Sequence, residues 1–132
     1  MYSVSVNNLT KKFGNFVSVD NISFNVKEGE IFGFLGSNGA GKSTTIRMLC
    51  GILEPTSGDA LVGGFSINSE PDKVKNSIGY MSQRFSLYND LTVQENIDFF
   101  GGVYGLSGSY FKERKNWVLE IANLKGKENL LT

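Results

Sequence analysis

The sequence predicts an α/β fold whose N-terminal part is an antiparallel β region. Three observations support this prediction. Apolar and polar residues alternate over much of residues 1–29, as they do in half-buried strands. A short apolar run, Ile31–Leu35, is followed by a glycine-rich stretch and then by a helical stretch at Thr45–Cys50. Beyond residue 91, a capping sequence and apolar residues at helical spacing indicate helices.

The first 29 residues are expected to form strands separated by turns. Three segments alternate in the manner of strands, namely Tyr2–Val6, Phe16–Val19 and Ile22–Val26. Turn-forming pairs interrupt them at Asn7-Asn8, Gly14-Asn15 and Asp20-Asn21. We therefore expect a small antiparallel sheet ahead of the α/β core. The run Ile31–Leu35 is predicted to be the first, buried strand of that core.

The glycine-rich stretch fits a phosphate-binding loop. It reads Gly36-Ser37-Asn38-Gly39-Ala40-Gly41-Lys42-Ser43-Thr44 and matches the pattern G-x-x-x-x-G-K-[ST]. Glycines let backbone N–H groups converge on an anion, and the helix that follows adds unpaired N–H groups and a partial positive charge. Lys42 is expected to reach the β- and γ-phosphates, Ser43 to ligate Mg²⁺, and Thr44 to bond an α-phosphate oxygen. The alternative is a plain glycine-rich turn, but a strand before and a helix after favour phosphate binding.

Short elements are expected between this loop and residue 91. The predicted turns are Glu54–Asp59 and Gly63-Gly64, with a short strand at Ala60–Val62 between them. A short helix is predicted over Pro71–Ser77, with proline in its first turn. Ile78–Met81 is predicted to be a second core strand, and a loop is expected from Arg84 to Leu91.

Two further helices are expected in the last forty residues. Thr92 and Glu95 match a capping box. One face of the helix that follows carries Val93, Ile97, Phe100 and Tyr104. Gly105 is expected to end this helix, and another is expected from Phe111 to about Asn123.

Composition excludes several classes of chemistry. The 132 residues hold 13 lysines and arginines against 13 aspartates and glutamates, so no net positive field favours nucleic acid and we expect no such partner. Cys50 is the single cysteine, which excludes an internal disulfide and fits a reducing compartment. No run of about 18 apolar residues is long enough to span a membrane. The chain has no histidine, so a histidine base or a serine–histidine triad is excluded.

The residues around the loop resemble the ATP-binding subunits of ABC transporters over most of the chain. Four segments carry the resemblance, namely Phe13–Phe24, Phe32–Thr45, Pro55–Gly58 and Ile78–Gln83. They are similar to the family's first hairpin, its Walker A segment, the turn after it, and the strand and glutamine of its Q-loop. The resemblance implies an incomplete P-loop NTPase core of the ABC type that binds ATP and Mg²⁺. The residues of Gly33–Leu35 and Ser43–Arg47 most resemble those of the family's branch that exports drugs, lipids or ions.

The resemblance also implies roles for residues outside the glycine loop. Phe13 matches the aromatic residue that stacks on adenine, and such stacking contributes roughly 1–3 kcal/mol in nucleic-acid systems; the alternative is a plain core residue. Gln83 matches the glutamine that contacts Mg²⁺ and the attacking water, which makes Lys42 and Gln83 the expected catalytic residues; the alternative is an ordinary loop amide. The segment Arg84–Asn89 matches the place where a membrane subunit docks, and folding onto the chain's own core stays equally open.

The resemblance divides the chain into three parts and indicates what is missing. Residues 1–29 would be the antiparallel β region, 30–83 the core from Walker A to the Q-loop, and 84–132 the start of a helical subdomain. No hydrophobic run ending in an aspartate–glutamate pair follows Gln83, so Walker B is absent. The signature L-S-G-G-Q is absent too, because Gly105–Ser109 lacks its second glycine and its glutamine. We therefore expect the N-terminal part of a longer subunit, one that binds nucleotide but does not usefully hydrolyse it alone.

The family's strands that carry Walker B and its neighbour are not recognisable in this chain, and this has a structural consequence. In the family they lie between Ile31–Leu35 and Ile78–Met81, so their absence leaves backbone edges without partners. We expect the two remaining strands to pair directly, to pair with another chain, or to leave the fold marginally stable.

The partners implied by the resemblance are ATP, a transmembrane permease subunit or domain that contacts the loop after Gln83, and a second ATP-binding subunit, as a homodimer of the full-length protein. The implied location is cytoplasmic, on the inner face of the cell membrane. One alternative is a soluble ABC-family ATPase of DNA repair, translation or iron–sulfur assembly. Another is an unrelated phosphotransferase, but neither an arginine-bearing lid nor an acceptor pocket is recognisable.

Overall fold

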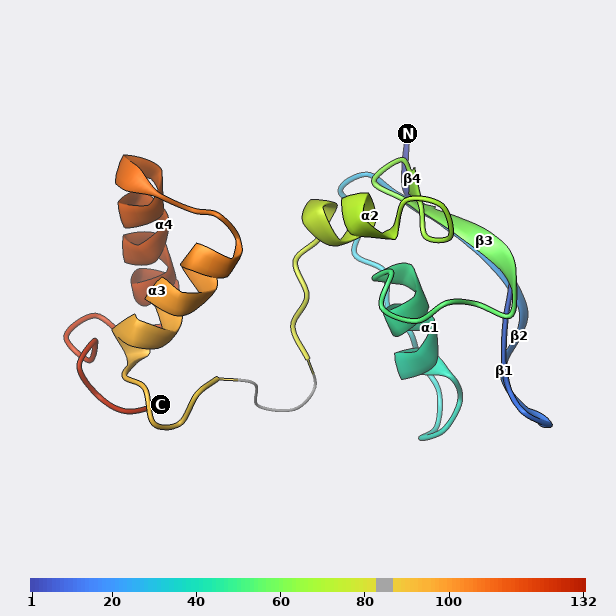
Figure 1. The fold of residues 1–132 in the computed structure, drawn as a ribbon, viewed down its shortest axis with the longest axis horizontal. Helices are drawn as coiled ribbons and strands as arrows, with labels where there is room; N and C mark the ends of the chain where they lie inside the picture. The colour runs from blue at the N-terminus through green and yellow to red at the C-terminus, as the bar shows by residue number, and fades with distance from the viewer. Residues whose placement is uncertain (83–86) are drawn as a thin grey trace. The chain divides into compact units, whose positions relative to one another are not determined.

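The computed structural model describes residues 1–82 and 87–132, and these form two compact units, Met1–Met81 and Ser82–Thr132. Gln83 and the segment Arg84–Ser86 lie outside the described residues. The N-terminal unit contains a four-stranded antiparallel sheet in the order β2-β1-β3-β4. Its strands are β1 (Tyr2–Phe13), β2 (Phe16–Lys27), β3 (Ser57–Val62) and β4 (Phe65–Ser66). Helices α1 (Lys42–Leu49) and α2 (Pro71–Ser77) lie on one side of this sheet (Figure 1).

A single apolar cluster joins the sheet of the N-terminal unit to its two helices. Met48 of α1 and Val74 of α2 are fully buried. They pack with the strand residues Val6, Leu9, Val19, Ala60 and Val62. Burying one side chain of this size stabilises a fold by roughly 1.5–3 kcal/mol. The cluster therefore fixes α1, and with it the end of the glycine loop, against the sheet.

Two of the predicted turns are β-bulges within continuous strands. Asn8 and Asn21 have φ values of +49° and +48°, a conformation that asparagine tolerates better than most residues. The β1–β2 register shifts between Val6 and Leu9, yet the ladder continues on both sides. A bulge adds one residue to one strand, so Val6 and Leu9 both reach the core although they are three apart. The prediction that these asparagines end strands is wrong, because a left-handed residue can be absorbed without breaking the ladder.

The predicted core strands Ile31–Leu35 and Ile78–Met81 are not strands. Within residues 1–82 and 87–132 neither segment has a ladder partner, so of the three expected outcomes the direct pairing of these two segments is wrong. Ile31 and Leu35 are almost completely exposed, as is Met81. The run Ile31–Leu35 is held instead by ring contacts, because Phe32 stacks on Phe24 of β2 at 5.1 Å between ring centroids. A strand conformation depends on partners for its N–H and C=O groups, and an apolar run alone does not supply them.

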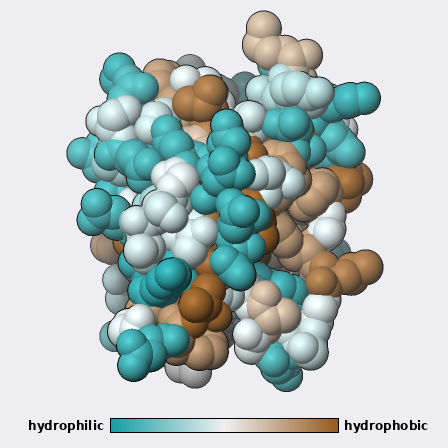
Figure 2. All heavy atoms as spheres, turned by 90° about the vertical axis from the view of Figure 1, so that its right-hand side faces the viewer, coloured by the Kyte–Doolittle hydropathy of each residue, from teal (hydrophilic) through white to brown (hydrophobic). Residues whose placement is uncertain are grey.

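The remaining local predictions for the N-terminal unit hold with small shifts. The turns at Gly14-Asn15 and Gly63-Gly64 are confirmed, as is the helix over Pro71–Ser77 with proline in its first turn. Strand β3 begins at Ser57, so the predicted turn at Glu54–Asp59 is shorter than expected. Figure 2 shows that the side of this unit turned to the viewer is largely hydrophilic with separate hydrophobic patches. Such a face suits the outer surface of a sheet whose other side is covered.

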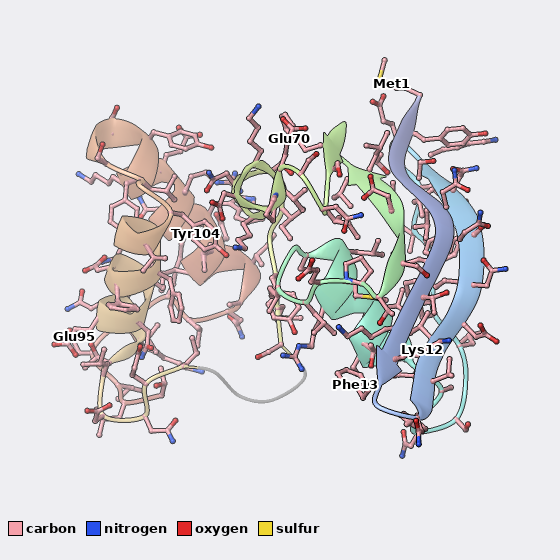
Figure 3. All side chains as sticks on the ribbon, turned by 45° about the vertical axis from the view of Figure 1, so that its right-hand side comes forward. Met1, Lys12, Phe13, Glu70, Glu95 and Tyr104 are labelled. Carbon is pink, nitrogen blue, oxygen red and sulfur yellow. The ribbon has the colours of Figure 1, made fainter. Side chains whose placement is uncertain are left out.

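The C-terminal unit contains helices α3 (Val93–Val103) and α4 (Gly108–Ile121). The capping box is confirmed, because the Thr92 N–H donates to Glu95 Oε2 at 2.8 Å and the Glu95 N–H donates to Thr92 Oγ1 at 3.3 Å. Gly105, with φ +67°, follows the end of α3 as predicted. Helix α4 begins three residues before the predicted Phe111. Figure 3 places Glu95 near the start of α3 and Tyr104 at its end.

A buried asparagine ties the start of α3 to the segments around it. Asn96 is 2% exposed. Its Oδ1 accepts from the Tyr88 N–H at 2.9 Å, and its Nδ2 donates to the Tyr88 carbonyl at 3.0 Å and to Thr132 Oγ1 at 3.1 Å. The Tyr88 ring packs edge-on against Phe99 at 5.1 Å.

In the described residues, none of the helices is both long and apolar enough to cross a bilayer.

Candidate functional site

The glycine-rich loop leads directly into the first turn of α1. The Ala40 N–H donates to the Ser37 carbonyl at 3.2 Å, which closes a turn inside the loop. Gly39 and Gly41 have φ values of +87° and +82°, where a side chain is strained. The two glycines differ in their surroundings. A Cβ on Gly39 would meet open space, whereas one on Gly41 would lie 2.3 Å from the Ser18 carbonyl oxygen of β2. Only glycine therefore fits where the loop meets the sheet.

The Lys42 side chain folds back over the loop. Its Nζ donates to the carbonyl oxygens of Gly36 and Ser37, each at 2.7 Å. An ammonium group has three donors, so these two bonds leave one for another acceptor. The positive charge is thereby held at the loop, where a phosphate group would need it.

The start of α1 presents backbone donors. The first intrahelical bond runs from the Thr45 N–H to the Gly41 carbonyl at 2.8 Å, so the N–H groups of residues 42–44 have no partner within this described helix. The first turn holds no acidic residue, and the helix cap Gly41 supplies no side chain. The partial positive charge of the helix end is therefore available to an anion. Ser43 is exposed on this turn, as a Mg²⁺ ligand would need to be.

The two threonines after Ser43 use their hydroxyl groups differently. Thr45 is buried and its Oγ1 donates to the Gly41 carbonyl at 2.9 Å. Thr44 is half-buried, and its Oγ1 lies 2.9 Å from Ser18 Oγ of β2. Sequence reasoning missed Ser18. Nothing in the chain marks a serine inside an alternating strand as the partner of a residue 26 positions later.

One of the open clefts on the N-terminal unit borders the loop. A cleft of about 380 Å³ lies between β2 and the loop and is lined by Ser18, Phe34, Ala40 and Lys42 among others. A larger cleft of about 720 Å³ is lined by polar residues of β1, β2 and β3 and by none of the loop residues. Because the donors and the charge converge at the loop, the smaller cleft is the candidate site. Cys50, at the C-terminal end of α1, is 8% exposed, and burial raises the pKa of its thiol, so it behaves as a small apolar residue.

Phe13 ends β1 and faces Phe16 across the hairpin. Phe13 is 49% exposed, so it is not a plain core residue. Lys11 Nζ lies 5.3 Å from the ring centroid, a cation–π contact. Figure 3 shows Phe13 beside Lys12 at the end of the strand. An exposed ring on a hairpin of the same unit is free to stack on a planar group.

The other predicted functional residues, Gln83 and the expected docking loop, follow the N-terminal unit in the chain, which ends at Met81. Gln83 and Phe85 are outside the described residues. Tyr88 and Leu87 are 47% and 40% exposed, so the described part of the expected docking loop keeps apolar surface at the outside. Tyr88 also contacts Phe99 and Phe100 of α3. The exposed apolar surface fits the docking of a partner, and the ring contacts of Tyr88 fit packing of the loop on its own unit.

A glycine loop that holds its own lysine and runs into a helix with unpaired N–H groups is the arrangement of a phosphate-loop protein. A family model described as ABC transporter matches residues 19–131. The chain belongs to the ABC transporter family.

Named relatives share most of this chain. The Probable multidrug ABC transporter ATP-binding protein YbhF of Escherichia coli strain K12 is 52% identical over 122 residues, which are 92% of this chain and 21% of that protein. The Linearmycin resistance ATP-binding protein LnrL of Bacillus subtilis strain 168 is 46% identical over 117 residues, 89% of this chain and 38% of that protein. The chain thus spans about a fifth to two fifths of the length of these relatives.

Solved structures share the fold. The ATP-binding subunit of an ABC transporter superposes with a TM-score of 0.85 and 27% identity, over 97% of this chain and 53% of that one. A dimeric post-hydrolysis state of the ATP-binding cassette MJ0796, bound to ADP and Pi, superposes with a TM-score of 0.79 and 28% identity, over 97% of this chain and 61% of that one. These neighbours confirm the predicted ABC-type P-loop fold class.

Proposed function

We propose that this chain is the nucleotide-binding portion of an ATP-binding subunit of an ABC exporter. It binds ATP through the loop from Gly36 to Thr44, and in the full-length protein hydrolysis at this site drives export across a membrane. The observation that carries the proposal is the position of Lys42, whose ammonium lies within the loop at the N-terminus of α1. The named relatives favour an exporter over the soluble alternative, because they are multidrug and antibiotic-resistance ATP-binding proteins.

Each part of the loop has a proposed task. Gly36, Ser37, Asn38, Gly39, Ala40 and Gly41 supply the backbone wrap around the phosphates. Lys42 binds the β- and γ-phosphates, and Thr44 binds an α-phosphate oxygen. Phe13 stacks on the adenine ring. The exposed hydroxyl of Ser43 and the side-chain oxygen of Gln83 are chemically suited to hold Mg²⁺, which would neutralise phosphate charge when bound.

The proposed partners follow from the same family. A transmembrane permease subunit or domain would contact the loop after Gln83, where Leu87 and Tyr88 keep exposed apolar surface. A second ATP-binding subunit would complete a homodimer of the full-length protein, as the dimeric neighbour does. This arrangement would put the protein at the inner face of the cell membrane. We propose no nucleic-acid partner, because the chain carries no net charge.

Titration with ATP and Mg²⁺ tests the proposal directly. The chain and its Lys42→Ala variant are titrated in parallel, and phosphate release is followed in the same samples. We expect saturable binding that Lys42→Ala weakens, together with negligible phosphate release, because the carboxylates that would orient Mg²⁺ and water are absent. Lys27→Ala, at an exposed lysine at the end of β2, is the matched control. Equal binding by Lys42→Ala and the parent chain would refute the site.

A further inference from the structure

The hydroxyl groups of Ser18 and Thr44 form a hydrogen-bonded pair between β2 and α1. The two oxygens lie 2.9 Å apart, and both residues are half-buried. Thr44 stands in the first turn of α1, at the end where the backbone N–H groups have no helical partner. The pair therefore lies at the edge of the proposed phosphate site, within reach of a ligand and partly shielded from water.

The neighbouring threonine shows why this pair matters. A hydroxyl has one proton to donate and two lone pairs to accept with. The Thr45 hydroxyl donates its proton to the Gly41 carbonyl, so that proton is not available to a ligand. Thr44 bonds another hydroxyl, and when Ser18 donates to it, the Thr44 proton stays available. A chain of two hydroxyls also polarises the second one, which strengthens its bond to an anionic acceptor.

Backbone packing holds the pair in place. The Ser18 carbonyl approaches Gly41 so closely that a Cβ there would lie 2.3 Å away, and the Val19 side chain would lie 3.1 Å from the same point. Strand β2 and the start of α1 are thus in direct contact at Ser18. The same hairpin carries Phe13. A shift of Ser18 relative to the loop would move the proposed adenine-stacking ring as well.

We propose that Ser18 is a positioning residue of the nucleotide site, which orients the Thr44 hydroxyl to donate to an α-phosphate oxygen. This role rests on the proposed function, since it requires a nucleotide at the loop. It predicts that the contribution of Ser18 to binding passes through Thr44 and concerns a phosphate that ATP and ADP share.

A double-mutant cycle tests this role. ATP and ADP affinities are measured by calorimetric titration for the parent chain, Ser18→Ala, Thr44→Val and the double variant. One lost hydrogen bond should weaken binding about 2- to 10-fold in each single variant, equally for ATP and ADP. The double variant should bind no more weakly than Thr44→Val alone, within about 2-fold. Ser18→Thr keeps the hydroxyl and should restore affinity. Ser3→Ala, which removes a serine bond to the Val26 carbonyl on the same hairpin, should change neither affinity.

The outcomes separate the two proposals. If the parent chain binds neither nucleotide, the proposed function and the role of Ser18 both fail. If it binds ATP and Ser18→Ala binds equally well, only the role of Ser18 fails. If the two single losses multiply in the double variant, Ser18 acts on the fold rather than through Thr44, and the role is overturned. Thermal unfolding of each variant without nucleotide shows whether a loss of affinity merely follows from a loss of folded protein.

Discussion

Lys42 Nζ donates a hydrogen bond to the carbonyl oxygen of Gly36 at 2.7 Å, across the glycine loop. A second bond of the same length reaches Ser37. The lysine that the sequence assigns to phosphate binding is thus already directed at the loop by the loop's own backbone. Preorganised charge lowers the cost of binding, because the side chain loses little further freedom when the ligand arrives.

The first prediction concerns this lysine. Lys42→Ala should weaken ATP binding about 10- to 100-fold, because hydrogen bonds to charged groups contribute about 1.5–3 kcal/mol each. The loss should be larger for ATP than for ADP, since the lysine is assigned to the β- and γ-phosphates. Titration with both nucleotides measures the two losses. Equal losses for ATP and ADP would contradict the assigned position of the ammonium.

The second prediction compares two glycines of the loop. Gly41→Ala should destabilise the N-terminal unit by more than about 3 kcal/mol, because a left-handed alanine costs roughly 1–2 kcal/mol and its Cβ would also strike the Ser18 carbonyl. Gly39→Ala has a similar φ but open space around it, so it should cost only about 1–2 kcal/mol.

Denaturant unfolding followed by far-UV circular dichroism, with amide exchange over residues 1–81, measures both costs. The comparison is controlled internally, since the substitution and the backbone region are the same. Similar stability of the two variants would show that the close approach of β2 to Gly41 is not a constraint.

The parts of the fold that could be predicted are those with local causes. The capping box at Thr92 and Glu95, the proline at the start of α2 and the turn at Gly14-Asn15 each act within a few residues. Their effect is the same in any surroundings. The glycine loop belongs with them, because its pattern and its neighbours in the chain are enough to identify it.

The parts that could not be predicted depend on residues far apart in the chain. Whether Asn8 ends a strand or forms a bulge depends on the ladder around it, and that ladder includes β3, some fifty residues later. The run Ile31–Leu35 has the composition of a buried strand but no partner to bury it in the described residues. Ser18 enters the site only through a contact with Thr44. Local patterns report propensity, and tertiary context decides its outcome.

The third prediction concerns the buried Asn96. Asn96→Leu keeps the volume but leaves the Tyr88 N–H without its acceptor, and an unpaired buried group costs about 1–3 kcal/mol. When the lost Nδ2 bonds are included, we expect the free energy of unfolding of the C-terminal unit to fall by about 2–4 kcal/mol. Thr132 Oγ1 still donates to the Tyr88 carbonyl at 2.8 Å, which limits the damage on that side.

The single tryptophan of the chain, Trp117 on α4, reports unfolding of the C-terminal unit by its fluorescence. Asn116→Leu makes the same substitution at an exposed position of α4 and should change stability by less than about 0.5 kcal/mol. Equal stability of the two leucine variants would mean that the Asn96 bonds contribute nothing net to the fold.

The last prediction concerns acid. The Thr92 N–H and its hydroxyl bond the Glu95 carboxylate and lower its pKa below the ordinary value of 4.5. A carboxylate with a lowered pKa stabilises the folded state at pH values above its ordinary pKa, and that contribution is lost as the pH falls through the folded pKa. Glu95→Gln keeps an oxygen for the capping box but removes the charge and its titration.

The parent chain should therefore be more stable than Glu95→Gln at pH 7, and the difference should shrink to nothing as the pH falls well below 4.5. Urea unfolding midpoints at pH 7 and pH 3, followed by Trp117 fluorescence, measure the difference at both ends. The variant should keep some acid dependence, because backbone N–H groups also lower the pKa of Glu128 in the same unit. A difference between the two proteins that stays constant from pH 7 to pH 3 would mean that the charge of Glu95 contributes nothing and that the capping box acts through its geometry alone.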